Sequence, residues 1–166
     1  RDATPIDVIE GRATWCVVCG ERDEVLATFA DGAIDVTLTD PPYNERTHKG
    51  AKARGGKLEK ETTVTFASLD DYQWWNRSID VSKRWCLAFC AAEQLALYEA
   101  ASFVGDAEHH AWIRAGVWIR SVASPQFTGG RPGTGADAIA IAHREGRKRW
   151  NGGGSVAVWT HGFAPD

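Results

Sequence analysis

Ile34-Asp35-Val36-Thr37-Leu38-Thr39 runs directly into Asp40-Pro41-Pro42-Tyr43, and this stretch decides the fold. Its first six residues form a short run rich in apolar and β-branched side chains, which predicts a buried strand over residues 34–39. Proline cannot donate to a sheet ladder, so the strand should end at Asp40. In open α/β sheets ligands bind beyond the carboxyl ends of the strands, and we therefore expect a ligand site at residues 40–43.

The tetrapeptide itself suits a flat ring that carries an amine. A residue that precedes proline is pushed towards extended geometry, which turns its carbonyl outward. An aromatic amine has two N–H donors, and the Asp40 side chain and the Pro41 carbonyl can accept one each while Tyr43 stacks on the ring. Hydrogen bonds on the Watson–Crick edge combined with stacking are the contacts needed for a base flipped out of a duplex. The residues thus favour a nucleobase as substrate.

Length and composition fit an ordinary globular domain. The 166 residues can bury a core as one domain, and the apolar content of 43% and charged content of 25% are typical. No apolar run approaches the length of a membrane span and no leader opens the sequence, which predicts a cytoplasmic protein without membrane contact. Because the chain begins at Arg1 and contains no Met, we interpret it as part of a longer protein.

The tetrapeptide resembles the catalytic motif of the DNA amino-methyltransferases, which transfer a methyl group from S-adenosylmethionine to adenine N6 or cytosine N4. The resemblance covers roughly residues 16 to 162 and continues in family order on both sides of the motif. The matching segments are Val18-Cys19-Gly20-Glu21, Glu24-Val25-Leu26, Asp31-Gly32-Ala33-Ile34-Asp35, Arg84-Trp85-Cys86-Leu87-Ala88-Phe89-Cys90, Gly116-Val117-Trp118-Ile119, Pro125-Gln126-Phe127-Thr128-Gly129, Arg131-Pro132-Gly133-Thr134-Gly135, Ala140-Ile141-Ala142-His143-Arg144 and Lys148-Arg149-Trp150-Asn151-Gly152-Gly153-Gly154.

This resemblance implies an α/β fold with a Rossmann-like S-adenosylmethionine-dependent methyltransferase sheet, mixed and with antiparallel edge strands. It makes Asp40, Pro41, Pro42 and Tyr43 the catalytic residues and S-adenosylmethionine the cofactor. Glu21 stands where the family usually has Asp, and with Asp40 it is the expected cofactor contact. The family's Phe-x-Gly-x-Gly cofactor turn does not occur in the chain, and the order of motifs resembles the permuted group, in which the catalytic half comes first.

Asp rather than Ser at the first catalytic position favours adenine N6 over cytosine N4. Two other functions stay open at this point. One is a methyltransferase-like module that has lost the cofactor half and only binds nucleic acid; the other is an RNA or protein methylase that shares the tetrapeptide. Methylases with the related Asn-Pro-Pro-Tyr signature have their cofactor half first, so motif order argues against them.

Two basic segments are candidates for contact with double-stranded DNA, although the net charge is −3. The first follows the tetrapeptide and contains Lys49, Lys52, Arg54 and Lys57 among glycines. The second is Arg147-Lys148-Arg149, and Trp150 beside it is a candidate for base contact. Lysine and arginine at such places bind phosphates with little sequence information. The alternative for both is a solvated surface loop. A homodimer is a further possible assembly.

The four cysteines could in principle form a zinc site, from Cys16 and Cys19 with Cys86 and Cys90. Both pairs lie in apolar runs that resemble strands, and residues three apart in a strand point to opposite faces, so Cys16 and Cys19 cannot converge on one metal. We therefore expect four buried, reduced cysteines that act as small hydrophobic residues, and no metal site.

Alternating strands and helices at the front predict a mixed α/β sheet. Strands are expected at residues 15–19, 34–39, 85–89, 116–120, 138–143 and 155–159, and helices at 23–29, 72–81 and 93–103. Asp70 and Asp71 are the expected caps of the second helix. Short links predict antiparallel closing strands. Residues 130–135 lack a following helix pattern and are expected to form a tight loop rather than a phosphate-binding turn. Most tryptophans are expected in the core.

Overall fold

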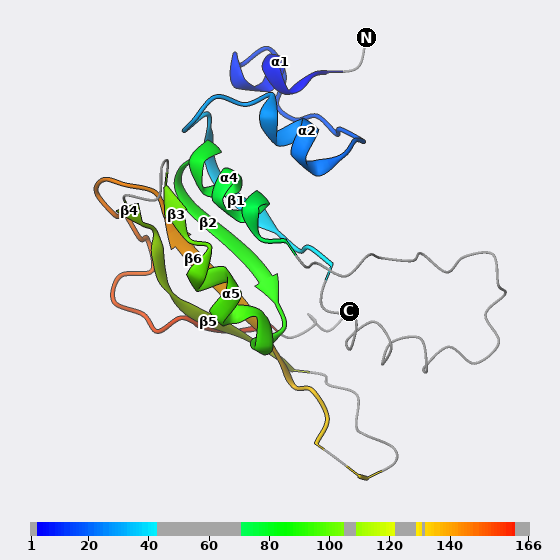
Figure 1. The fold of residues 1–166 in the computed structure, drawn as a ribbon, viewed down its shortest axis with the longest axis vertical. Helices are drawn as coiled ribbons and strands as arrows, with labels where there is room; N and C mark the ends of the chain where they lie inside the picture. Colours follow the sequence, from blue (N-terminus) through cyan, green and yellow to red (C-terminus); the bar gives the residue numbers. More distant parts are fainter. Residues whose placement is uncertain (1–2, 43–70, 105–108, 122–128, 131, 162–166) are drawn as a thin grey trace, which may run out of the picture.

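The structure is a computed structural model that describes residues 3–42, 71–104, 109–121, 129–130 and 132–161. Its centre is a five-stranded sheet with helices against one side (Figure 1). The helices are α1 (Pro5–Ile9), α2 (Arg22–Ala27), α4 (Gln73–Val81) and α5 (Leu95–Ala100), with a 3-10 turn at Ala92–Gln94. The strands of the sheet are β1 (Ile34–Thr39), β2 (Ser82–Cys90), β5 (Trp112–Arg120), β6 (Ala136–His143) and β7 (Val158–His161).

The sheet is mixed, as the alternation of strands and helices predicts. Its order is β1-β2-β6-β5-β7, and β1 pairs with β2 in parallel. Strand β6 runs antiparallel to both β2 and β5, which confirms the expected antiparallel part. A separate small sheet joins β3 (Phe103–Val104) to β4 (His109–His110).

The last strand corrects one expectation. We expected residues 155–159 to form an antiparallel neighbour, but β7 begins at Val158 and pairs in parallel with β5. The chain between β6 and β7 is long enough to cross the end of β5 and reach its outer edge. A parallel pair needs such a crossing, whereas a tight turn would have returned the chain beside β6.

Helices α4 and α5 cover one face of the sheet, and the core lies between (Figure 1). Trp75, Ile79 and Tyr98 of these helices have no exposed surface. The strands below them present small side chains, namely Cys86, Ala88, Cys90, Ala138, Ala140 and Ala142. Small residues on the sheet leave the volume that two large rings fill at close-packed density. The indole N–H of Trp75 donates to the Ser102 hydroxyl at 2.8 Å, so its polar atom is also satisfied.

Most expected elements are confirmed. The strand over residues 34–39 has the predicted bounds, and those at 85–89, 116–120 and 138–143 lie inside β2, β5 and β6. The helix expected at 72–81 is α4. Its N-cap is Tyr72 and not Asp71, whose carboxylate accepts the Gln73 N–H at 2.8 Å from one residue further out; Asp70 lies outside the described residues. The helix at 23–29 is α2, and the one at 93–103 ends at Ala100 because Phe103 begins β3. Residues 132–135 lead into a strand rather than a helix, as expected.

The strand expected at residues 15–19 is wrong. These residues form no strand, and Trp15 and Val17 are 72% and 81% exposed. A short apolar run becomes a strand only where a neighbouring strand accepts its hydrogen bonds, and none of the described strands lies beside it. The lead-in segment before it instead contains α1, whose capping box joins the Thr4 and Asp7 side chains and backbones. Hydrogen bonds from Thr4, with Arg12 beside it, lower the pKa of Asp7 to about 2.

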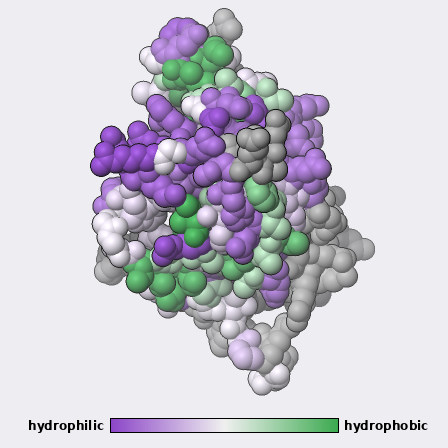
Figure 2. Space-filling model, turned by 60° about the vertical axis from the view of Figure 1, so that its left-hand side comes forward, coloured by the Kyte–Doolittle hydropathy of each residue, from purple (hydrophilic) through white to green (hydrophobic). Residues whose placement is uncertain are grey.

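The tryptophans divide between core and surface. Trp74 and Trp75 are buried as expected, while Trp150 is 37% exposed. Hydrophobic residues also reach the surface elsewhere, as green patches between purple hydrophilic ones (Figure 2). Within the part of the chain that the structure describes, no helix has the length and apolar character needed to cross a membrane.

Candidate functional site

Asp40 is the first residue after β1, at the carboxyl end of the parallel pair. The last paired residue of β1, Thr39, lies opposite Ala88 of β2. The Asp40 side chain is exposed, Pro41 is buried and Pro42 is half-buried. The structure therefore holds the proline pair against the body of the protein and leaves the carboxylate at the surface. Tyr43 lies outside the described residues.

Strand β1 was expected to be buried, but one of its faces is exposed. Val36 and Leu38 are 50% and 67% exposed. Two reasons are visible: β1 is the first strand of the sheet order, and α4 and α5 cover only the opposite face. Because side chains alternate along a strand, Val36, Leu38 and Asp40 share the face without helices, which we call the open face.

The open face has large apolar side chains from the neighbouring strands. In β2, Trp85 lies opposite Val36 and Leu87 opposite Leu38. A small apolar hollow of about 170 Å³ lies further along the face and is lined by Leu87, Phe89, Trp118, Ile139 and Trp159. The rings of Phe89 and Trp118 meet edge to face at 5.9 Å. The open face is thus apolar over several strands.

The second basic segment lies at the far end of β1 from Asp40. Arg147, Lys148 and Arg149 line a hollow of about 780 Å³, which we call the basic hollow. Its other walls come from Asp35, Val36, Arg84, Trp85, Leu87, Trp150 and Asn151. Asp40 is not part of this lining: Asp35 lies five residues from it, about 16 Å on an extended chain, and Leu87 lies closer, opposite Leu38. The structure therefore separates these predicted DNA contacts from the predicted catalytic residues.

Three rings join β2, β7 and the segment after β6 beside this hollow. Trp85 and Trp150 meet with their ring centroids 5.1 Å apart, and the Trp85 indole N–H donates to the Arg149 carbonyl at 2.8 Å. Trp159 lies 6.3 Å from Trp150. The sequence pointed to Trp150 but not to Trp85 or Arg84. Strand alternation was the available signal, since it places Trp85 with Leu87 and Phe89 on one face.

Positive charge dominates the basic hollow. None of Arg84, Arg147, Lys148 and Arg149 forms an ion pair with another described residue, and the acid of the lining, Asp35, lies 3.7 Å from Lys83. The buried His143 imidazole, stacked edge to face with Trp85 at 4.5 Å, responds to this environment. Burial lowers the pKa of His143, and the charges of Lys148 and Arg84 lower it further. Its Nε2 atom has no hydrogen-bond partner among the described residues.

The other expected cofactor contact, Glu21, lies in a different layer. It is the exposed residue that precedes α2, and its side chain does not cap the helix. Helix α2 packs against α4, where the Arg22 guanidinium lies 5.0 Å from the Trp74 ring centroid. No described contact joins Glu21 to Asp40. The roles of Glu21 and Asp40 as cofactor contacts therefore stay predictions. The expected DNA contacts of the first basic segment, Lys49, Lys52, Arg54 and Lys57, lie outside the described residues.

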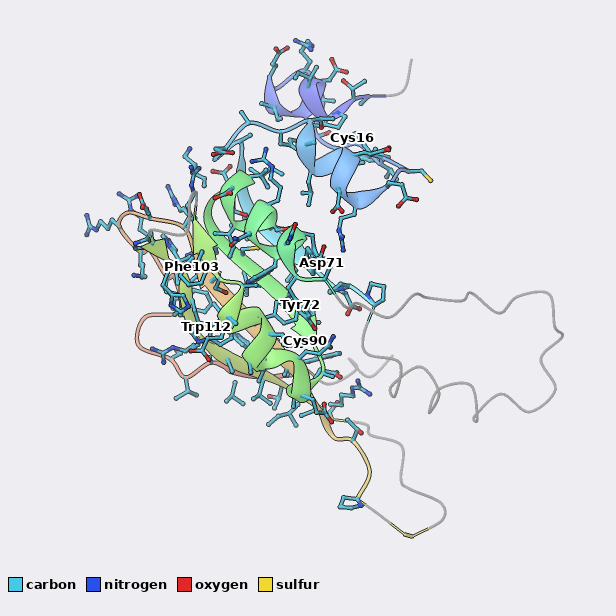
Figure 3. All side chains as sticks on the ribbon, viewed as in Figure 1. Cys16, Asp71, Tyr72, Cys90, Phe103 and Trp112 are labelled. Atoms are coloured by element: carbon cyan, nitrogen blue, oxygen red, sulfur yellow. The ribbon has the colours of Figure 1, made fainter. Side chains whose placement is uncertain are left out.

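The cysteines follow the expectation only in the sheet. Cys86 and Cys90 are buried, and burial raises the pKa of both thiols, that of Cys90 to about 12. Cys16 is half-buried and Cys19 exposed, because residues 15–19 form no strand. Figure 3 shows Cys16 in the N-terminal segment and Cys90 in the sheet. Within the described ranges, no three or more His, Cys, Asp or Glu side chains gather as a metal site would require.

No protein-family model matches the sequence, and no curated protein matches it. Several solved structures are similar. The complex of M1.HpyAVI with SAM is 14% identical, with 87% of this chain and 54% of that chain covered and a TM-score of 0.42. M1.HpyAVI alone is 13% identical, with 100% and 68% covered and a TM-score of 0.47. TTHA0409 of Thermus thermophilus, complexed with S-adenosyl-L-methionine, is 15% identical, with 80% and 55% covered and a TM-score of 0.47. The chain spans about half the length of two of these three structures.

Proposed function

We propose that this chain is the catalytic part of a DNA methyltransferase that modifies an exocyclic amine of a base. The carrying observation is the position of Asp40-Pro41-Pro42, with an exposed carboxylate at the carboxyl end of an edge strand in a mixed α/β sheet. That is the part of such a sheet where ligands bind. The tetrapeptide and its order among the other motifs support the same class.

Two acceptors at this place suit an amine with two N–H groups. The Asp40 carboxylate accepts one proton as a hydrogen bond, and the Pro41 carbonyl accepts the other. Pro42 keeps Pro41 extended. Pro41 is buried and neither hollow includes it, so its carbonyl must become accessible before it can accept the amine. Acceptors that are fixed before the reaction stabilise the positive charge that develops on the nitrogen. Holding the amine at attack distance lowers the barrier further.

The proposed cofactor is S-adenosylmethionine, which supplies the methyl group when bound. The described residues fit it in charge, because the exposed carboxylates of Asp40 and Glu21 suit a cationic donor. They do not enclose it, since neither the basic hollow nor the small apolar hollow includes Asp40 or Glu21. We therefore assign to these residues the binding of charge and of the substrate amine, and no further step.

For the substrate we propose adenine N6 in double-stranded DNA, with the base flipped out of the helix. Asp at position 40 supports adenine, and cytosine N4 is the alternative. Flipping follows from the chemistry, because a target atom inside a stacked duplex cannot reach the two acceptors. The basic residues 147–149 and the lysines and arginine after the tetrapeptide are the proposed phosphate contacts.

Replacing the central carboxylate tests the proposal. Asp40→Ala in the full-length protein should lower the rate of methyl transfer by about 10²–10³-fold, the cost of losing one preorganised group. The measurement is transfer of a labelled methyl group from S-adenosylmethionine to duplex DNA, with the modified base identified by mass spectrometry. Glu99→Ala is the matched control, since Glu99 is an exposed carboxylate on α5, which covers the other face of the sheet.

Glu99→Ala should keep the wild-type rate. Normal methylation by Asp40→Ala would contradict the proposed mechanism. N4-methylcytosine as the product would show that the substrate base is cytosine and not adenine.

A second candidate function is a module that binds nucleic acid without catalysis. The basic hollow favours it, because this hollow lies away from Asp40. A full-length protein that binds DNA but neither binds S-adenosylmethionine nor methylates would support that candidate.

A further inference from the structure

The basic hollow has the features of a site of its own. Its volume of about 780 Å³ lies within the range of pockets that hold small ligands. Strands β1 and β2 form its floor through Val36, Trp85 and Leu87, and residues 147–151 form its rim. Its lining reaches from Asp35 to Leu87, which lies opposite Leu38, and it does not include Asp40.

Its charge favours an anionic ligand. Four cationic side chains line it, namely Arg84, Arg147, Lys148 and Arg149, against the carboxylate of Asp35. None of the four has a carboxylate partner among the described residues, and Asp35 lies close to Lys83. Unpaired cations gathered at one hollow raise the local concentration of anions. The lowered pKa of His143, to which Lys148 and Arg84 contribute, agrees with a positive potential at this place.

The tryptophan rings beside the basic hollow favour a ligand that has a flat ring as well as negative charge. Trp150 lies on the rim, 37% exposed, and its ring meets the half-buried Trp85 at 5.1 Å. The Trp85 indole donates to the carbonyl of Arg149, which ties the rim to the floor and holds the basic residues beside the rings. A partly exposed aromatic ring next to arginine and lysine is typical of sites that bind unpaired bases and their phosphates together.

We propose that the basic hollow binds an unpaired nucleotide of single-stranded DNA, with the base stacked on Trp150 and the flanking phosphates on Arg84, Arg147, Lys148 and Arg149. This site rests on the proposed DNA binding and adds an unpaired nucleotide to the phosphate contacts of residues 147–149, while it involves neither Asp40 nor the cofactor. An acidic peptide would use the same cations, but it has no flat ring to cover the exposed indole. The rings therefore favour the nucleotide.

The test measures binding of a labelled oligothymidylate to the chain by fluorescence anisotropy, with no methyl donor present. Trp150→Ala should weaken binding about 10- to 100-fold, as expected for loss of one stacked base. Trp150→Phe keeps a ring and should restore most of the affinity. Lys148→Ala should weaken binding of every sequence. It should also reduce the steepness of a plot of log binding constant against log salt concentration by about one.

Two controls separate this site from general attraction of polyanions. Trp15→Ala removes a tryptophan that is 72% exposed but lies in the N-terminal segment, and it should leave the affinity unchanged. An abasic oligonucleotide should bind the wild type more weakly than oligothymidylate does, and it should bind Trp150→Ala and the wild type equally. Polyglutamate that binds as tightly as oligothymidylate, or a Trp150→Ala variant with wild-type affinity and an unchanged melting temperature, would overturn the proposal. Since no methyl donor is used, these outcomes are independent of whether Asp40 is catalytic.

Discussion

The two faces of β2 differ in the size and the exposure of their side chains. On the face under the helices, Cys86, Ala88 and Cys90 are small and at most 1% exposed. On the open face, the alternate residues Trp85, Leu87 and Phe89 are large and only half-buried. Where α4 and α5 contribute large rings, the strand contributes small side chains; where no helix covers it, the strand contributes its own large ones. The covered face is therefore a packed core, and the open face is exposed along β1 but buried over β6 at Ile139, Ile141 and His143.

The covered face should carry most of the stability. Trp75 has no exposed surface, meets Tyr98 edge to face at 5.1 Å and donates to Ser102. Trp75→Ala should lower the free energy of unfolding by about 3–5 kcal/mol, because it leaves a cavity and removes the donor to the Ser102 hydroxyl. Urea unfolding measures the change. Trp15→Ala, at an exposed site, should change it by less than about 0.5 kcal/mol, and equal costs for the two variants would contradict this division.

Adding side-chain volume should destabilise the covered face but not the open face at β1. Ala140 lies at the centre of the covered face with no exposed surface, so Ala140→Leu should cost about 1–3 kcal/mol by overpacking. Val36→Leu adds one methylene on the open face, where Val36 is 50% exposed, and should be close to neutral. Thermal unfolding of both variants provides the comparison. A large cost for Val36→Leu would mean that the open face is packed as tightly as the other.

The smallest effect concerns His143, which lies on the open face opposite Trp85. Its pKa is lowered from 6.5 in the folded chain, first by burial and then by Lys148 and Arg84. The unfolded chain then binds the proton at a higher pH than the folded chain does, so stability should fall as the pH drops below 6.5. Urea unfolding at a series of pH values measures this slope. His143→Gln should reduce the slope; an unchanged slope would assign it to other groups.

Local sequence was sufficient for elements with strong signals. The run over residues 34–39 and the two prolines predicted both the strand and its end, because proline stops a ladder whatever surrounds it. Asp71 and the apolar spacing after it predicted α4. Residues 15–19 carry a similar apolar run without a partner strand, and there the prediction failed. A strand forms through bonds to another strand, and the run alone does not contain that information.

The candidate site shows the same limit. The tetrapeptide, the basic residues 147–149 and Trp150 were all readable in the sequence, because each is a local pattern. Their separation along β1 was not readable, nor was the contribution of Arg84 and Trp85 to the basic hollow. These depend on which strands are neighbours, and β2 comes beside both β1 and β6 only through pairings between distant parts of the chain.

By itself, the amino-acid sequence determined the strand that ends at Thr39, the proline pair that stops it and the mixed α/β class, because period-two patterns and proline act over a few residues. Only the tertiary structure decided which face of the sheet is covered, that β7 joins β5 in parallel, and that Trp85 and Trp150 meet beside four cations. Those features come from burying large rings against small strand residues over long sequence separations, where one packing arrangement excludes the others.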